Sequence, residues 1–565
     1  MASTAAAPAP RPKGWRLLKL ALQTRKSATM LGFGFSSGLP YALLIGTLNA
    51  WLGEEKIDLA TIGVLSWIGL SYSFKFLWSP LVDRLALPGL ERLGRRKGWI
   101  LLCQIVMVLG FAGLAATDPV HAIGTFALFA FLAALASATQ DVAVDAWRIE
   151  VADEATPVEL LSSIYQFGYR IASIVGGALA LVLAGRMSWP LVYLLMAGLI
   201  VLVIGVTLRA PDTPRPEQGA LHAALARPGE LSPRARGLAL AVVAVSWAWA
   251  IGTILHFMVG MLAPAVPGQP HPSVGDFTRG YGPWIVAATV AVPLVVAATT
   301  NWLKASGRAV LTAPDTRVSP LRTAMNHLYV ALVSPLAELS SRLGWGVLIV
   351  IGMILTYTLC YNIWSSFAFP FYLEFLHYSK DEVAFASKVF GIFMTILGIS
   401  LGGYMFARLG RMPTILIGAI LPILGNFVYA DLAEGAPHID AVGAAIGLKT
   451  LFGLFGFDAR MIRLLLAISF ENVSTGIAGA AFVAYMSGIV SKSYTAVQYA
   501  LLSSLTFLIG SLGRGIAGEA FDSYGYATVF RWTAAAGLAA VLFVLLEWVR
   551  VARAARVAVS PELPR

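Results

Sequence analysis

Two carboxylates and a cation share one face of the fourth apolar stretch of the chain. Asp141 and Asp145 lie four residues apart, and Arg148 follows about one helical turn later. Charged side chains inside the hydrocarbon of a membrane are costly, so each needs a partner or an aqueous passage. A carboxylate such as Asp141 could bind and release a proton as a solute crosses. The same groups could instead form ion pairs that hold one end of the passage closed.

Depth within the stretch separates these two chemistries. Asp145 and Arg148 fall close to its end, at the depth of the membrane surface. There they could pair with the loop that bears Asp83, Arg84 and Arg95, and so latch the passage without touching a solute. We therefore interpret these five side chains as gating residues.

Further charges lie deep in the predicted spans. Asp141 is deeper than the gating residues, and we assign it to proton coupling. Counting about 1.5 Å per residue places Arg170 near mid-membrane in the fifth stretch, where a cation is seldom needed for packing alone. We predict that Arg170 binds an anionic group of a solute. A structural ion pair of Asp141 with Arg170 or with Lys75 is the alternative.

The second part of the chain carries a comparable set. Glu471 and Asn472 lie at about mid-depth in their span, and we assign Glu471 to both coupling and binding. Arg514 lies toward the outer end of the following span. The residues that we predict to contact the solute are Arg170, Lys75, Gln140, Tyr169, Glu471 and Asn472.

The composition indicates the elements that must position these side chains. Of the 565 residues, 58% are hydrophobic and 13% are charged, whereas about a quarter of a soluble domain is charged. The apolar runs are long enough to cross a bilayer core of about 30 Å, and lipid cannot satisfy their backbone groups unless they are helical. The formal net charge of +11 comes from basic residues in alternate loops, which reflects topology and argues against a nucleic-acid partner.

Fourteen apolar stretches are visible, and the basic loops between them predict that both chain ends lie in the cytoplasm. Their residue ranges are 29–50, 60–83, 98–117, 122–147, 160–184, 188–208, 237–262, 282–303, 345–372, 384–407, 412–431, 462–490, 497–517 and 527–551.

A faint internal repeat divides the chain. Arg92–Arg95 and Arg408–Arg411 follow the second span of their blocks, and Leu160–Ser163 and Leu501–Ser504 open the fifth. Two parallel six-helix halves would place both pairs of similar tetrapeptides at equivalent positions, as in major facilitators. We thus predict an all-α membrane protein of the major facilitator fold, divided into a basic tail (1–28), an N-terminal half (29–208), linkers with an inserted hairpin (209–344), a C-terminal half (345–551) and a tail (552–565).

Pairs of small residues predict where helices cross closely. They are Gly34 with Gly38, Gly398 with Gly402, and Gly515 with Gly518. Between the hairpin and the second half, residues 318–343 have amphipathic character and could lie along the membrane surface.

The sequence does not indicate an enzyme. Cys103 and Cys360 fall inside predicted spans, and the seven histidines are scattered without the spacing of metal ligands. A nucleophile with a neighbouring base is not evident either. We expect no cofactor and no metal, and the chain to be a monomer.

Several ordered motifs resemble the AmpG family of muropeptide permeases. The first half contains the runs Leu31-Gly-Phe-Gly-Phe-Ser-Ser-Gly-Leu-Pro40, Phe74-Lys-Phe-Leu-Trp-Ser-Pro80, Gly94-Arg-Arg-Lys-Gly-Trp99 and Ser137-Ala-Thr-Gln-Asp141. The second half contains Phe470-Glu-Asn472, Ala481-Phe-Val-Ala484 and Thr495-Ala-Val-Gln-Tyr-Ala-Leu-Leu-Ser503.

This resemblance implies a specific activity. The family works in the bacterial inner membrane and imports N-acetylglucosaminyl-1,6-anhydro-N-acetylmuramyl peptides for wall recycling, driven by the proton motive force. The expected partners are therefore a small glycopeptide substrate, protons and the lipid bilayer. A related permease for another anionic sugar conjugate or peptide is an alternative, and a membrane sensor that does not transport is a third. Two features depart from the family: the position of the extra hairpin, and a seventh core span without a charge.

Overall fold

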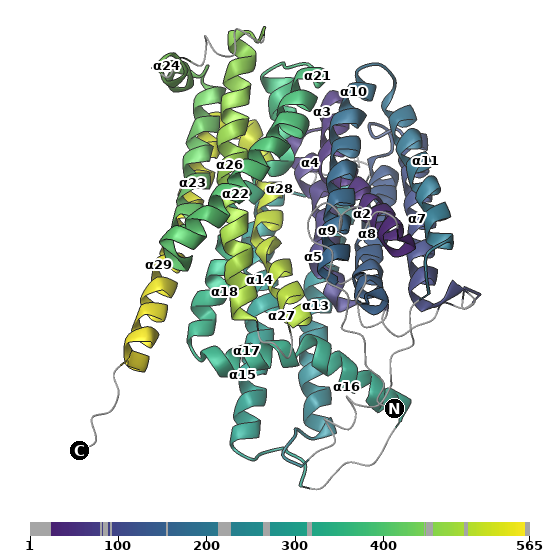
Figure 1. The fold of residues 1–565 in the computed structure, drawn as a ribbon, viewed down its shortest axis with the longest axis vertical. Helices are drawn as coiled ribbons and strands as arrows, with labels where there is room; N and C mark the ends of the chain where they lie inside the picture. Colours follow the sequence, from purple (N-terminus) through teal and green to yellow (C-terminus); the bar gives the residue numbers. More distant parts are fainter. Residues whose placement is uncertain are drawn as a thin grey trace, which may run out of the picture.

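The structure is a computed structural model, and it describes most of the chain. The described residues are 24–559, except for 79–81, 83–86, 88, 91–92, 154–155, 157, 213–227, 264–271, 313–318, 446, 448–455 and 491–494. Within these residues the protein is built of helices that run roughly side by side (Figure 1).

The first half contains six predicted spans. Five of them are long apolar helices, and the second span is a shorter one. Its elements are α2 (Arg25–Ala42), a π-helical turn (Leu43–Thr47), α3 (Leu48–Glu54), α4 (Leu59–Leu65), α5 (Leu70–Phe74), α7 (Arg95–Ala116), α8 (Ile123–Val151), α9 (Val158–Ile174), α10 (Ala180–Ala184) and α11 (Trp189–Leu208).

The inserted hairpin and the linker after it are also helical. The hairpin consists of α13 (Pro233–Leu262), α14 (Val274–Val286) and α15 (Val292–Ala305). The amphipathic region at 318–343 forms α16 (Pro320–Leu332) and α17 (Ser334–Leu343), as its pattern predicts.

The second half repeats the six-span arrangement. Its elements are α18 (Gly346–Thr356), α19 (Leu359–Asn362), α20 (Ala368–Pro370), a π-helical turn (Phe371–Phe375), α21 (Lys380–Val383), a π-helical segment (Ala384–Phe390), α22 (Gly391–Leu409), α23 (Arg411–Ala433), α24 (Pro437–Ala445), α26 (Ala459–Ile489), α27 (Thr495–Thr506), α28 (Leu508–Tyr524) and α29 (Tyr526–Val559).

Thirteen helices of the described chain are long and apolar enough to cross a membrane, and each lies on one of the fourteen predicted stretches. The remaining stretch, 60–83, holds the shorter apolar helix Leu59–Tyr72. A 3-10 turn at Ser66–Gly69 interrupts it, where the Ser66 hydroxyl donates to the Gly63 carbonyl at 2.6 Å. The predicted fold class is confirmed: two six-helix halves with an inserted two-helix hairpin.

Two ends of the bundle can be distinguished, and we call them upper and lower as in Figure 1. At the upper end, Glu54 at the end of α3 pairs with Lys380 at the start of α21. Tyr526, which begins α29, packs at this end on Phe371 and Phe375. Because α2 leads up to Glu54 and α29 leads down from Tyr526, the start of α2 and the end of α29 both lie at the lower end.

Glycines allow the closest helix crossings, at the positions that the small-residue pairs predict. A Cβ added at Gly38 would lie 2.7 Å from the carbonyl oxygen of Tyr169, and one at Gly34 would overlap that of Tyr165. Gly398 meets the backbone of α26 in the same way, and Gly518 meets that of α4. Backbones at van der Waals distance replace the hydrophobic driving force that is missing between helices in lipid.

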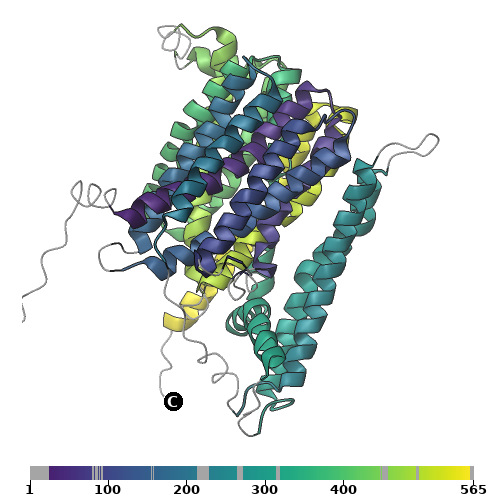
Figure 2. The same ribbon diagram turned by 90° about the vertical axis from the view of Figure 1, so that its right-hand side faces the viewer.

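The hairpin is anchored to both halves, along one side of the bundle (Figure 2). Trp67 of the first half packs against Phe257 and Phe277 of the hairpin, at 5.9 and 5.8 Å between ring centres. Glu519 of the second half accepts hydrogen bonds from the backbone N–H groups of Val274 and Gly275, at 2.7 and 2.9 Å. A carboxylate at the N-terminus of α14 satisfies free donors and complements the helix dipole.

We expect Glu519→Ala to destabilise the protein, because two N–H groups lose a charged acceptor. One hydrogen bond to a charged group contributes about 1.5–3 kcal/mol, so the loss of both should lower the free energy of unfolding by about 3–6 kcal/mol at most. Thermal unfolding of the purified protein measures this change. The control is Glu434→Ala, which removes an exposed pair with Arg531 and should have little effect. Equal melting temperatures for the two variants would contradict the anchoring role of Glu519.

Candidate transport site

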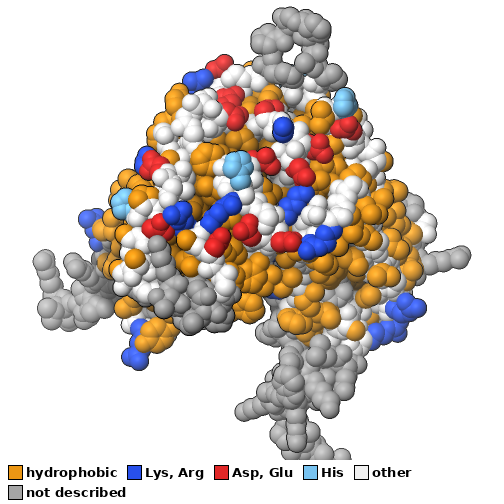
Figure 3. All heavy atoms as spheres, turned by 90° about the horizontal axis from the view of Figure 1, so that it is seen from above, with side chains coloured by type: hydrophobic (Ala, Val, Ile, Leu, Met, Phe, Trp, Pro, Cys, Tyr) orange, Lys and Arg blue, Asp and Glu red, His pale blue; other side chains and the backbone are white. Residues whose placement is uncertain are grey.

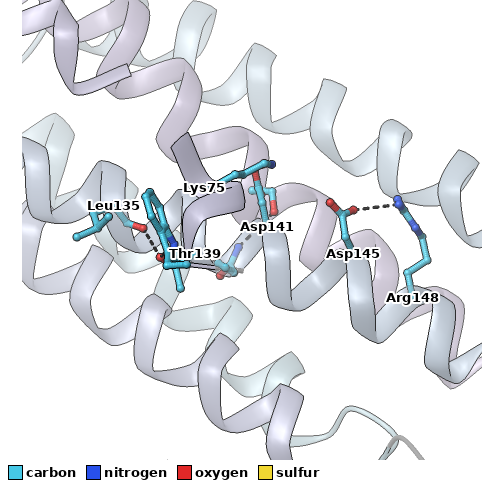
Figure 4. A network of polar contacts seen from close by, with 9 residues as sticks. Lys75, Leu135, Thr139, Asp141, Asp145 and Arg148 are labelled. Carbon is cyan, nitrogen blue, oxygen red and sulfur yellow. Dashed lines mark hydrogen bonds and ion pairs between the residues drawn. The ribbon is translucent and has the colours of Figure 1, made fainter. Parts of the chain in front are cut away.

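The fourth core span brings a carboxylate beside a lysine of the second. Lys75 Nζ lies 3.4 Å from Asp141 Oδ2, and Figure 4 shows the two side chains reaching toward each other from neighbouring helices. Their side chains are 28% and 13% exposed, so the pair retains access to solvent inside the bundle. The structure therefore forms the Asp141–Lys75 pair, one of the two structural alternatives for Asp141. The other carboxylate oxygen, Oδ1, is buried without a hydrogen-bond partner.

Polar and aromatic groups surround this pair. Gln140 is fully buried, and its amide nitrogen donates to the Ser36 hydroxyl at 3.0 Å, which ties α8 to α2. Tyr169 is half-buried, and the centre of its ring lies 6.4 Å from that of Tyr41. The Tyr41 ring packs edge-on against Tyr72, with 5.2 Å between the ring centres. Of the predicted binding residues in this half, Tyr169 therefore keeps exposed surface, whereas Gln140 is buried and holds two helices together.

Arg170 is exposed, and the described residues offer it neither a hydrogen bond nor an ion pair. It lies about two helical turns below Gly177, so both share nearly the same face of the fifth span. A Cβ at Gly177 would lie 2.8 Å from the side chain of Lys388, which belongs to the second half. The face that bears Arg170 is thus directed toward the eighth core span.

The second half holds its own polar cluster. The Tyr429 hydroxyl donates to Glu471 Oε2 at 2.5 Å and lies 2.5 Å from the Tyr372 hydroxyl. The Thr395 hydroxyl donates to Asn472 Oδ1 at 2.8 Å. Glu471 and Asn472 are half-buried and bring together α26, α23, α22 and the seventh span. Both predicted residues thus lie in one polar cluster.

Lys388 is a functional candidate that our sequence interpretation missed. It lies in the π-helical segment Ala384–Phe390, with its ammonium 4.9 Å from the centre of the Phe369 ring. Glu471 is the acidic group that acts on it electrostatically, although no ion pair closer than 4 Å joins the two. The available signal was simple: Lys388 is the sole Asp, Glu, Lys or Arg in the predicted span 384–407.

The predicted gating residues form different pairs from those we expect. Arg148 bonds Asp145 within the same helix at 2.9 Å, because three residues of spacing put the two side chains side by side (Figure 4). Arg95, at the start of α7, bonds Glu150 at 3.0 Å near the end of α8. Asp145 does not pair with the loop of Arg95 here. The predicted latch belongs to the state that is open at the opposite end, so it stays a prediction. Asp83 and Arg84, the other predicted partners, lie outside the described residues.

Ion pairs between the halves occur at the upper end. Lys380 Nζ lies 2.7 Å from Glu54 Oε2, which also accepts from the Trp189 indole at 2.6 Å. Arg186 and Asp381 form a two-pronged pair with both distances at 3.0 Å. Figure 3 looks onto this end and shows acidic and basic side chains gathered between apolar flanks. In the described part of the chain, the ion pairs that join one half to the other are these two, so the upper end is the closed one.

Known proteins with similar sequences and folds share this architecture. The family model of the Major Facilitator Superfamily matches residues 30–459. The chain belongs to the major facilitator superfamily. This major facilitator resembles the crystal structure of the POT family transporter PepTSo, with a TM-score of 0.55 and 14% sequence identity. The match covers 94% of this chain and 98% of that one.

Curated relatives cover both halves and the hairpin region. The anhydromuropeptide permease of Escherichia coli (strain K12) is 29% identical over 538 residues, which are 94% of this chain and 82% of that protein. A putative transporter, AmpG 4, of Rickettsia conorii is 26% identical over 91% of this chain and 94% of that one. These relatives are permeases or transporters, and this major facilitator is a transporter and not an enzyme.

We expect Gly63→Ala to weaken closure of the upper end. The added Cβ would lie 2.7 Å from the Arg514 carbonyl oxygen, where α4 of one half crosses α28 of the other. Overpacking costs about 1–3 kcal/mol, so the closed state should lose population by about fivefold or more. A cysteine at Ile45, just below this crossing, reports opening through its rate of labelling by an impermeant maleimide added from the upper side.

Gly198→Ala is the matched control for that substitution. It makes the same change within α11, where an added Cβ meets nothing within 4 Å. The helix propensity gained is equal at both sites. Equal labelling rates in the two variants would contradict the assignment of the α4–α28 crossing to the closed upper end.

Proposed function

We propose that this transporter imports anhydro-muropeptides, namely N-acetylglucosaminyl-1,6-anhydro-N-acetylmuramyl peptides, in symport with protons. One observation supports this above all: both halves place ionisable side chains at mid-depth, in a chain similar to the E. coli anhydromuropeptide permease over 94% of its length. A solute that carries peptide carboxylates and a polar disaccharide needs cations, hydrogen-bond donors and aromatic faces. Lys75, Arg170, Tyr169, Glu471 and Asn472 supply them.

Asp141 and Glu471 are the proposed proton carriers. Each carboxylate is only partly exposed and lies beside a cation or a phenol of a neighbouring helix. Charge in the membrane interior is costly, so a change in the neighbouring contacts changes the balance between the protonated and ionised forms. A solute anion that competes for Lys75 would leave Asp141 without its counter-ion and favour proton uptake at that site.

Orientation and gating complete the proposal. The lower end faces the cytoplasm of the bacterial inner membrane, because the basic loops lie there, and the protein acts as a monomer. The structure then corresponds to a state closed toward the outside. In the opposite state Asp145, Arg148 and Arg95 exchange their present partners for contacts across the lower end, together with Asp83 and Arg84.

A second solute class follows from one feature of the seventh span. Tyr357–Ser365 contains no Asp, Glu, Lys or Arg, a departure from the pattern that the AmpG resemblance implies. A permease for another anionic sugar conjugate or peptide would satisfy the same polar clusters. Competition by a panel of such compounds against labelled muropeptide separates the two.

Uptake into proteoliposomes tests the proposal. We expect labelled anhydro-muropeptide to accumulate when an inward proton gradient is imposed, and only to equilibrate without it. Uptake that ignores the gradient would contradict proton coupling, and an absence of uptake for every muropeptide would contradict the proposed solute.

Arg170→Ala is the sharpest variant for the same assay. An exposed, unpaired cation in mid-span contributes little to folding, so the variant should unfold at the parent temperature while uptake falls by about tenfold or more. Arg279→Ala, which removes a cation paired at the surface with Asp276, is the control. Parent-like uptake by the Arg170 variant would return this residue to a structural role.

A further inference from the structure

Arg514 is a buried cation between the two halves that the proposed mechanism does not use. It is 5% exposed and lies in α28, about 20 Å along the helix from Leu501 and about 15 Å from Tyr524. The carbonyl of this same residue meets α4 of the first half at Gly63. The Arg514 backbone is therefore part of the crossing at which the upper end is closed.

One hydrogen bond holds the Arg514 side chain in place. Its Nε donates to the backbone carbonyl of Asn362 at 3.0 Å. That carbonyl is available because α19 ends at Asn362 and the seventh span is interrupted there. Interrupted helices within a membrane leave backbone carbonyls to bind ions and polar groups. The bond orients the guanidinium and leaves its outer edge unused.

The two terminal nitrogens of Arg514 have no acceptor among the described residues. Within the described chain Arg514 makes no further hydrogen bond or ion pair, and neither terminal nitrogen is completely buried. Each nitrogen therefore keeps some exposed surface. Nη1 also faces the first half, since it lies 3.8 Å from the position of a Cβ at Gly69.

The charge of Arg514 is not compensated by an acidic side chain of the described chain. None of the described Asp or Glu side chains forms an ion pair or hydrogen bond with it, and its hydrogen bond goes to a backbone carbonyl. Lys75 differs, because it pairs with Asp141. A buried cation without a counter-ion is strongly unfavourable, so a ligand that brings negative charge would be held tightly there.

We propose that Arg514, oriented by the Asn362 carbonyl, binds a carboxylate of the transported solute. A planar guanidinium with two free N–H groups fits the two oxygens of a carboxylate. The bound carboxylate would contact both halves at once, at the upper limit of the passage. This assignment rests on the proposed function, because it names the part of the solute that enters the site.

Two solutes that differ in one chemical group test the proposal. One is an anhydro-muropeptide with its peptide carboxylates free, and the other has them capped as carboxamides. The parent protein should prefer the free acid by about tenfold or more in KM, since a hydrogen-bonded charge pair contributes that much. Arg514→Gln should reduce the preference to less than about threefold, with kcat less affected than KM.

Three further arms make the outcome decisive. Arg514→Lys keeps the positive charge but loses the planar guanidinium with its two N–H donors. This variant should show an intermediate preference for the free acid. Arg279→Gln, at an exposed pair in the hairpin, should keep the parent preference. Thermal stabilisation of each purified variant by the two solutes reports binding even where uptake is too slow to measure.

The results separate this inference from the proposed function. If the parent takes up neither solute and neither stabilises it, the proposed function is refuted and this inference with it. If the parent transports muropeptide but Arg514→Gln keeps the full preference for the free acid, only the carboxylate site is refuted. A parent that does not distinguish the two solutes refutes the site as well.

Discussion

The cost of charge inside a membrane is the constraint on which the rest of this structure depends. The described residues place Lys75, Asp141, Lys388, Glu471 and Arg514 within membrane-spanning segments, where packing alone would favour apolar side chains. Their environments form a series. Lys75 and Asp141 are paired at 3.4 Å, Glu471 is hydrogen-bonded to a phenol at 2.5 Å, and Arg514 has only a backbone carbonyl at 3.0 Å. Incomplete compensation leaves each group ready to exchange its partner for a proton or an anionic solute.

The helices that carry these charges are joined by contacts that can open. Within each half, glycines let backbones meet directly, as at Gly38 against Tyr169 and at Gly398 against Val473. Between the halves, closure at the upper end rests on the Gly63 crossing and on two ion pairs, of which Arg186–Asp381 is more than half exposed. Exposed pairs contribute about 0–1 kcal/mol, so the closed upper end is reversible at low cost. Rigid halves that are joined by weak contacts at the upper end can alternate access to a fixed site.

The sequence predicts the helices and the contacts within each half well. Apolar length locates all fourteen stretches, the glycine pairs locate the crossings, and the Asp141–Lys75 pair was one of two alternatives. Contacts between halves could not be derived, because they depend on how two separately folded units meet. The Glu54–Lys380 pair belongs to this class, because it joins the end of the first span to the start of the eighth. The approach of Lys388 to Gly177 of the fifth span belongs to it too, although the lone charge of Lys388 in its span was visible in the sequence. Asp145 illustrates the same limit, since the spacing that suggests a latch also lets Arg148 bond it within the helix.

Solute-driven proton movement tests the central claim most directly. Proteoliposomes that contain a lumenal pH dye, with no gradient imposed, are exposed to anhydro-muropeptide. The lumen should acidify as the solute enters. Asp141→Asn should still equilibrate the solute but without acidification, whereas Asp118→Asn, in an exposed pair with His121, should behave as the parent. Solute entry into parent vesicles at constant lumenal pH would contradict the account.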